Sequence, residues 1–112
     1  MDEAGDLVLE ALGDRHRRAI VRLLAQRPRP VHELAAGLPI SRPAVSRHLR
    51  LLKDAGLVTD RPAGNERIYQ LHASGIGVLQ AYVNEVWAEA IARFRLLADN
   101  TAITSDSARQ RR

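Results

Sequence analysis

The sequence predicts a mainly α-helical domain that carries one small β-hairpin. Apolar residues recur at helical spacing over residues 3–12, 15–26, 31–38, 41–55 and 73–98. Two short β-type runs, LVTDR and ERIYQL, flank the turn-forming sequence PAGN. At 112 residues the chain is long enough to bury one compact core. These observations favour about five helices, with the hairpin placed before the last of them.

The first four helices are bounded by residues that begin or end a helix. Asp14 is the predicted N-cap of the second helix, and the prolines of RPRP at 27–30 end it because proline cannot continue a helix. VHELAAGL then predicts two helical turns. Ser41 is the predicted cap of the next helix, whose first turn tolerates Pro43. The two helices joined by GLPI have the form of a helix-turn-helix.

The hairpin and the last helix complete the predicted domain. A hairpin directly after a helix-turn-helix is a wing, so the expected architecture is a winged helix-turn-helix. The last helix carries an apolar stripe too wide to pack only on one small domain. Residues 3–98 are expected to form this domain, and residues 99–112, which lack periodicity, are expected to be a disordered C-terminal tail.

Composition excludes several classes of function. The chain has no cysteine, which removes disulfides, thiolate metal sites and cysteine nucleophiles. It shows no long apolar run and no secretory signal pattern, so a cytoplasmic protein without membrane contact is expected. The four histidines are scattered, and neither a nucleophile elbow nor a glycine-rich phosphate loop is present. We therefore predict no enzyme activity, no metal and no cofactor.

Positive charge is concentrated in one region of the chain. The net charge is +4, and residues 41–67 carry five Arg and one Lys against three acidic residues. A local basic surface of this kind suits a polyanion. Cations and hydroxyls along a helix neutralise phosphates, and side chains in its first turns can reach base edges in the major groove. Double-stranded DNA is the predicted partner, and residues 3–98 the predicted DNA-binding and dimerisation domain.

The helix over residues 41–55 supplies most of the predicted DNA contacts. Arg42 or Arg47 is expected to reach a guanine edge, and Ala44 a thymine methyl group. The other predicted contacts are Ser41, Pro43, Ser46, His48 and Arg50 on the helix, and Arg61, Asn65 and Arg67 in the wing. The polar wing residues are explained equally well by exposure of a hairpin tip.

The apolar stripe of the last helix predicts a homodimer. The expected interface residues are Leu79, Val83, Val86, Trp87, Ala90, Ile91, Phe94 and Leu97, together with Leu7, Val8 and Leu12 of the first helix. A sharper hypothesis places a small-molecule effector pocket at this interface, lined by Tyr82, Trp87 and Phe94.

Three blocks of the sequence resemble the arsenic-repressor (ArsR/SmtB) family of winged helix-turn-helix transcriptional regulators. They are LGDRHRRAIVRLL, VHELAAGLPISRPAVSRHLRLLKDAGLV and DRPAGNERIYQL, and the resemblance runs through residues 7–98. It implies a homodimer joined through its first and last helices. Such a dimer would bind an imperfect palindrome in operator DNA, usually repress transcription, and release the DNA when an effector binds.

The chain departs from the metal-sensing members of that family at both of their common metal sites. By register, the Cys-x-Cys pair of those members falls on Pro30 and His32, which supply no thiolate. The last helix contains carboxylates but no histidine after His72, so an interhelical zinc site lacks its nitrogen ligands. The resemblance therefore implies a metal-independent member, of the type found in actinobacteria.

The predicted function is a sequence-specific, dimeric repressor that binds a palindromic operator, its own promoter included, and lacks the family's cysteine metal site. Two alternatives remain open. A winged helix of this kind could dock a protein with the same surface, or the repressor could sense a metal through histidine and carboxylate ligands. An effector of unknown identity is the remaining predicted partner.

Overall fold

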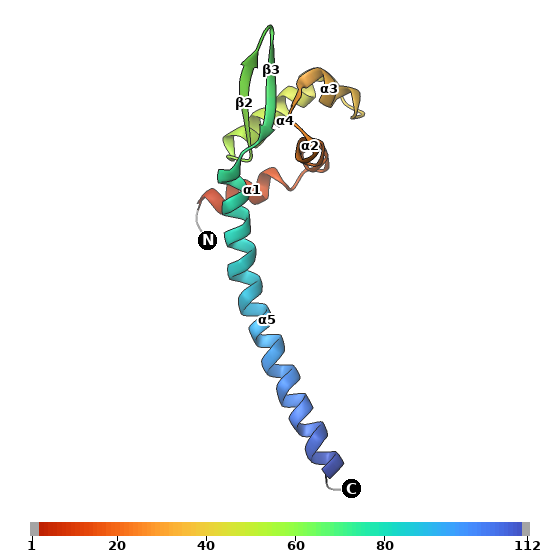
Figure 1. The fold of residues 1–112 in the computed structure, drawn as a ribbon, viewed down its shortest axis with the longest axis vertical. Coiled ribbons are helices and arrows are strands. Elements are labelled where there is room, and N and C mark those ends of the chain that lie inside the picture. Colours follow the sequence, from red (N-terminus) through yellow and green to blue (C-terminus); the bar gives the residue numbers. More distant parts are fainter. Residues whose placement is uncertain (1–2, 111–112) are drawn as a thin grey trace. The chain divides into compact units, whose positions relative to one another are not determined.

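The computed structural model describes residues 3–110, with side chains described for residues 3–100. The described residues form α1 (Glu3–Ala11), α2 (Arg15–Gln26), β1 (Arg29–Pro30), α3 (Val31–Ala36), α4 (Arg42–Asp54), β2 (Val58–Ala63), β3 (Glu66–Leu71) and α5 (Ala73–Gln110) (Figure 1). The predicted fold class, helices with one wing, is confirmed. Two units are present, one ending at Gln80 and the other beginning at Ala81. None of the helices in the described part has the length and hydropathy needed to cross a bilayer.

The core of the first unit collects apolar side chains from α1 to α4 and from the start of β2. Its members are Val8, Ala11, Ile20, Leu24, Leu34, Val45, Leu49, Leu52, Leu57 and Val58. On α4, Val45, Leu49 and Leu52 follow the helical spacing that predicts one buried face. Because this face is used for packing, exposed residues of α4 such as Arg42, Arg47 and Arg50 lie on the rest of the helix surface.

The wing is part of a three-stranded antiparallel sheet with the strand order β1-β3-β2. β2 and β3 pair from Val58 opposite Leu71 to Ala63 opposite Glu66, and Gly64 makes the turn with a φ of +64°. Figure 1 shows this hairpin beside α4. β1 was not predicted, because its two residues lie in the RPRP segment that ends α2 and are too few to show a period.

Two glycines join the end of α4 to the start of α5. Gly56 adopts a φ of +79°, which favours glycine, and directs the chain from α4 into β2. The Gly75 amide donates to the Gly56 carbonyl oxygen at 2.8 Å. A Cβ atom on Gly75 would lie 2.4 Å from that oxygen, so the two backbones can approach this closely only without a side chain.

The last helix continues farther than the sequence predicts. Helix α5 includes residues 99–110, for which we expected a disordered tail, and residues 111–112 lie outside the described residues. After Gly77 the sequence contains neither glycine nor proline, so it offers no strong signal that would end a helix.

Candidate nucleic-acid interface

The N-terminus of α4 is fixed by its cap. The Ser41 hydroxyl accepts a hydrogen bond from the Ala44 amide at 3.3 Å, and Pro43 occupies the first turn. Among the predicted contacts on α4, the exposed side chains are Ser41, Arg42, Pro43, Ser46, Arg47 and Arg50, whereas Ala44 is half-buried. The capped end of the helix therefore presents two arginines and two hydroxyls to solvent.

His48 departs from its predicted role as a phosphate contact. Its side chain is only 19 % exposed and faces α2, with its Nδ1 3.4 Å from an Arg17 nitrogen and 4.0 Å from Asp14 Oδ1. The His16 ring lies 5.8 Å away. Burial lowers the pKa of His48, and the Asp14 carboxylate opposes that effect. His48 is thus a packing residue between α4 and α2, and we remove it from the predicted phosphate contacts.

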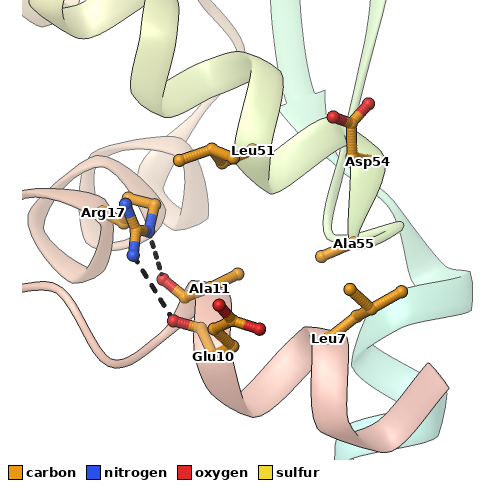
Figure 2. Close-up of a pocket in the computed structure, with 7 residues that line it drawn as sticks. All are labelled: Leu7, Glu10, Ala11, Arg17, Leu51, Asp54 and Ala55. Carbon is orange, nitrogen blue, oxygen red and sulfur yellow. Dashed lines mark hydrogen bonds between the residues drawn. The ribbon is translucent and has the colours of Figure 1, made fainter. Parts of the chain in front are cut away.

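Arg17 joins α1 to α2 beside a cavity in the first unit. Figure 2 shows its guanidinium donating to the carbonyl oxygens of Ala11, at 2.6 Å, and Glu10, at 3.4 Å. These carbonyls lie at the C-terminal end of α1, where a cation is favourable. The cavity measures about 190 Å³ and is lined by Leu7, Glu10, Ala11, Arg17, Leu51, Asp54 and Ala55. Its lining includes none of the aromatic residues predicted for an effector pocket.

The three predicted wing residues have different surroundings. Arg61 and Asn65 are exposed at the outer part of the hairpin. Arg67 is also exposed, but its Nε donates to Asp60 Oδ2. The Lys53 ammonium, at the end of α4, contacts Asp60 Oδ1 at 2.8 Å. Hydrogen bonds from Lys53 and then Arg67 hold the pKa of Asp60 below its ordinary value.

A cleft brings a helix arginine and a wing arginine together. It is lined by Pro30, Val31, His32, Arg42, Glu66, Arg67 and Tyr69, and measures about 360 Å³. His32 Nδ1 lies 3.0 Å from Glu66 Oε1, which links α3 to β3 across the cleft. The structure thus places Arg42 of α4 and Arg67 of the wing on one surface.

Sequence reasoning missed several residues that support this surface. Lys53, Asp60 and the His32–Glu66 pair each join two elements, and Arg17 joins two helices. Asp60 is one of three acidic residues inside the basic stretch over 41–67, so its place in the sequence does not single it out. Within residues 3–100, histidine and acidic side chains form no group of three that could hold a metal ion.

The apolar stripe in the second unit is largely exposed. Val83, Val86, Trp87, Ile91, Phe94 and Leu97 are between 39 % and 65 % exposed. Ala90 is half-buried. A shallow hollow on α5 is lined by Val83, Asn84, Trp87, Ala88 and Ile91, without Tyr82 or Phe94. A run of exposed apolar side chains along one helix is typical of a surface that another protein covers.

The interface residues predicted in the first unit differ in their exposure. Leu7 is 48 % exposed, whereas Val8 is 1 % exposed and belongs to the protomer core. Leu12 and Leu79 are partly buried against the same core. Because Val8 already packs within its own protomer, we remove it from the predicted dimer contacts.

Comparisons with known proteins give a consistent result. Residues 14–60 match the family model described as bacterial regulatory protein, arsR family. The chain is 48 % identical over 95 residues to the HTH-type transcriptional regulator Rv2034 of Mycobacterium tuberculosis, and this match covers 85 % of the chain and 89 % of the relative.

Two solved structures resemble the chain along most of their length. A possible transcriptional regulator for arsenical resistance is 41 % identical, with a TM-score of 0.69 and coverage of 82 % of this chain and 94 % of that one. The homodimeric winged helix-turn-helix DNA-binding domain of Mb0332 from Mycobacterium bovis is 30 % identical, with a TM-score of 0.64 and coverage of 81 % and 84 %.

Proposed function

The chain belongs to the ArsR family of bacterial regulatory proteins, and we propose that it is a homodimeric repressor that binds a palindromic operator. As a family member it is a DNA-binding transcriptional regulator and not an enzyme. The observation that carries the proposal is the exposed, capped start of α4, where Arg42 and Arg47 project while the opposite face packs in the core. Because the promoter DNA of a bacterium lies in the cytoplasm, the proposed repressor acts there.

The proposed mode of binding places α4 in the major groove. Arg42 or Arg47 then hydrogen-bonds a guanine edge, Ala44 contacts a thymine methyl, and Ser46 and Arg50 bind phosphates. The wing reaches the adjacent minor groove or backbone through Arg61 and Asn65. Two copies of α4 read half-sites about one helical turn apart. Binding therefore weakens with salt, with a slope of about −0.9 for each phosphate neutralised.

The exposed stripe on α5 supports the homodimer. These apolar side chains are exposed to water in the single chain. A second copy that covers them removes their surface from water, which stabilises the dimer. In the first unit, Leu7 is exposed on α1 and stays a proposed dimer contact. The Mb0332 domain, which this chain resembles, is described as homodimeric.

The proposed repressor does not sense a metal. The chain has no cysteine, and the family's cysteine pair falls on Pro30 and His32. In the structure the His32 ring faces the Glu66 carboxylate of the wing. Adding zinc, nickel or cobalt to the protein–DNA complex should leave its affinity unchanged, and release of DNA by any of these ions would restore the metal-sensing alternative.

The proposal is tested by titrating the protein against its own upstream promoter DNA with excess non-specific competitor. A specific complex with a twofold footprint is expected. Arg47→Ala should weaken it about tenfold, the cost of one good base or phosphate contact, without changing the dimer.

Arg22→Ala is the matched control, because it removes the same charge from an exposed position on α2. Equal effects of the two substitutions would mean that α4 is not the recognition helix. Binding that competitor removes entirely would favour a protein partner for this surface.

A further inference from the structure

Lys53, Asp60 and Arg67 form a cluster that ties the end of α4 to both strands of the wing, and we call it the wing clamp. Asp60 Oδ1 contacts the Lys53 ammonium at 2.8 Å, and Asp60 Oδ2 accepts a hydrogen bond from Arg67 Nε. Each carboxylate oxygen therefore has its own cation. One cation comes from α4 and the other from β3, while Asp60 itself lies on β2.

The sheet register explains why these groups meet. Asp60 lies opposite Tyr69 in the antiparallel pair, so Arg67, two residues from Tyr69, is its diagonal neighbour on the same face. Lys53 is in the last turn of α4, directly before the bend at Gly56 that leads into β2. The three side chains thus converge where the recognition helix, the bend and the hairpin meet.

The burial of Asp60 sets it apart from its partners. Its side chain is 6 % exposed, whereas those of Lys53 and Arg67 are 52 % and 53 % exposed. A buried carboxylate is stable only when it is paired and hydrogen-bonded, and removing its charge releases both cations. The favourable pairing also keeps the pKa of Asp60 low, so the carboxylate is charged at neutral pH.

We propose that Asp60 is a positioning residue for DNA binding, which holds the wing in a fixed orientation to α4 through Lys53 and Arg67. This inference rests on the proposed function of α4 and the wing. Arg67 then acts through Asp60 and is not a direct phosphate contact, in contrast to its role as predicted from the sequence. The exposed wing residues Arg61 and Asn65 make the contacts that the clamp positions.

Two explanations of Asp60 predict opposite signs for one substitution. Asp60→Asn removes a negative charge close to a DNA-binding surface, so a purely electrostatic role predicts tighter binding. A positioning role predicts weaker binding, because the wing loses its fixed orientation although the protein becomes more positive. Asp54→Asn is the matched control: it makes the same chemical change at an exposed position one residue from Lys53.

The experiment measures affinity by fluorescence anisotropy on two duplexes from the chain's own upstream DNA. One spans the whole footprint, and the other is trimmed to the base pairs that α4 covers. Asp60→Asn should bind the full duplex about tenfold more weakly than wild type and the trimmed duplex equally well. Asp54→Asn should bind both duplexes at least as tightly as wild type.

Salt dependence separates positioning from direct contact at Arg67. Arg67→Gln should weaken binding without changing the salt slope, whereas Arg61→Gln should reduce the slope by about 0.9. A reduced slope for Arg67→Gln would overturn the proposal, as would an Asp60→Asn variant that binds the full duplex as well as wild type.

One further measurement keeps the test decisive. Hydrogen exchange of the β2 and β3 amides should accelerate in Asp60→Asn while amides of the α2 core stay protected, which separates loss of the clamp from unfolding. Unchanged exchange in the wing would contradict the proposal whatever the DNA affinity. If the wild-type chain shows no specific binding, the proposed function itself fails and this inference fails with it.

Discussion

His48 packs α4 against α2. Its ring is largely buried, and it faces Asp14, Arg17 and His16. Burial is the strongest influence on its pKa and lowers it, while Asp14 acts in the opposite direction. The neutral imidazole is therefore favoured in the folded protein relative to the unfolded chain.

A pH dependence of stability follows from the lowered pKa of His48. The unfolded chain binds more protons than the folded one just below the ordinary pKa of about 6.5, so stability falls as the pH drops from there toward the folded pKa. Thermal unfolding at constant protein concentration should give a lower Tm at pH 5.5 than at pH 7.5. His48→Gln should flatten this difference, and an undiminished pH dependence in that variant would assign it to another group.

The roles of some residues can be predicted from the sequence, whereas the roles of others depend on contacts made only in the folded protein. Asp14 accepts hydrogen bonds from the His16 and Arg17 amides at 2.8 and 3.1 Å, which confirms the predicted cap. Ser41 is confirmed in the same way, because a cap depends only on residues within one turn. Asp60 could not be predicted, since its partners come from α4 and β3 and meet it only in the folded chain.

At the scale of elements, α4 is amphipathic in a way that periodicity predicts. Its buried positions recur at helical spacing, which leaves Arg47 and Arg50 outward. β1 was missed because two residues show no period, and it is a strand only through its pairing with β3. The extension of α5 beyond residue 98 was missed because loss of apolar periodicity does not by itself end a helix.

Near the start of α5, glycine is required at position 75 but not at position 77. Gly75→Ala would place a Cβ 2.4 Å from the Gly56 oxygen, and forcing the backbones apart should cost about 1–3 kcal/mol of the free energy of unfolding. Gly77→Ala meets no atom within 4 Å and should be neutral or stabilising by up to about 1 kcal/mol. Chemical denaturation measures both values, and equal stabilities for the two variants would show that the contact is unimportant.

At the scale of the whole molecule, the two units differ in how their apolar residues are used. Among the described residues, the first unit buries ten apolar side chains in its own core, and the stripe on α5 in the second unit stays exposed. The fold class could be predicted because the elements of the first unit follow simple periods. The division into two units could not, because it depends on which apolar residues find partners within the chain.

The proposed dimer gives a prediction with a closely matched control. Phe94 and Leu96 are each 65 % exposed, but two residues along a helix face in nearly opposite directions, and only Phe94 belongs to the stripe. Phe94→Asp should shift the mass measured by light scattering toward the monomer and weaken operator binding. Leu96→Asp should remain dimeric, and dissociation of both variants alike would argue against the stripe as the interface.

The strand order β1-β3-β2 leaves β2 as an outer strand of the sheet. Outer strands are templates for unwanted pairing between molecules, which leads to aggregation. On β2 that pairing would meet the charge of Arg61 and the missing N–H group of Pro62. Arg61, a proposed DNA contact, and Pro62 beside it therefore also keep the wing from recruiting a strand from another molecule, which matters for a small protein concentrated on DNA.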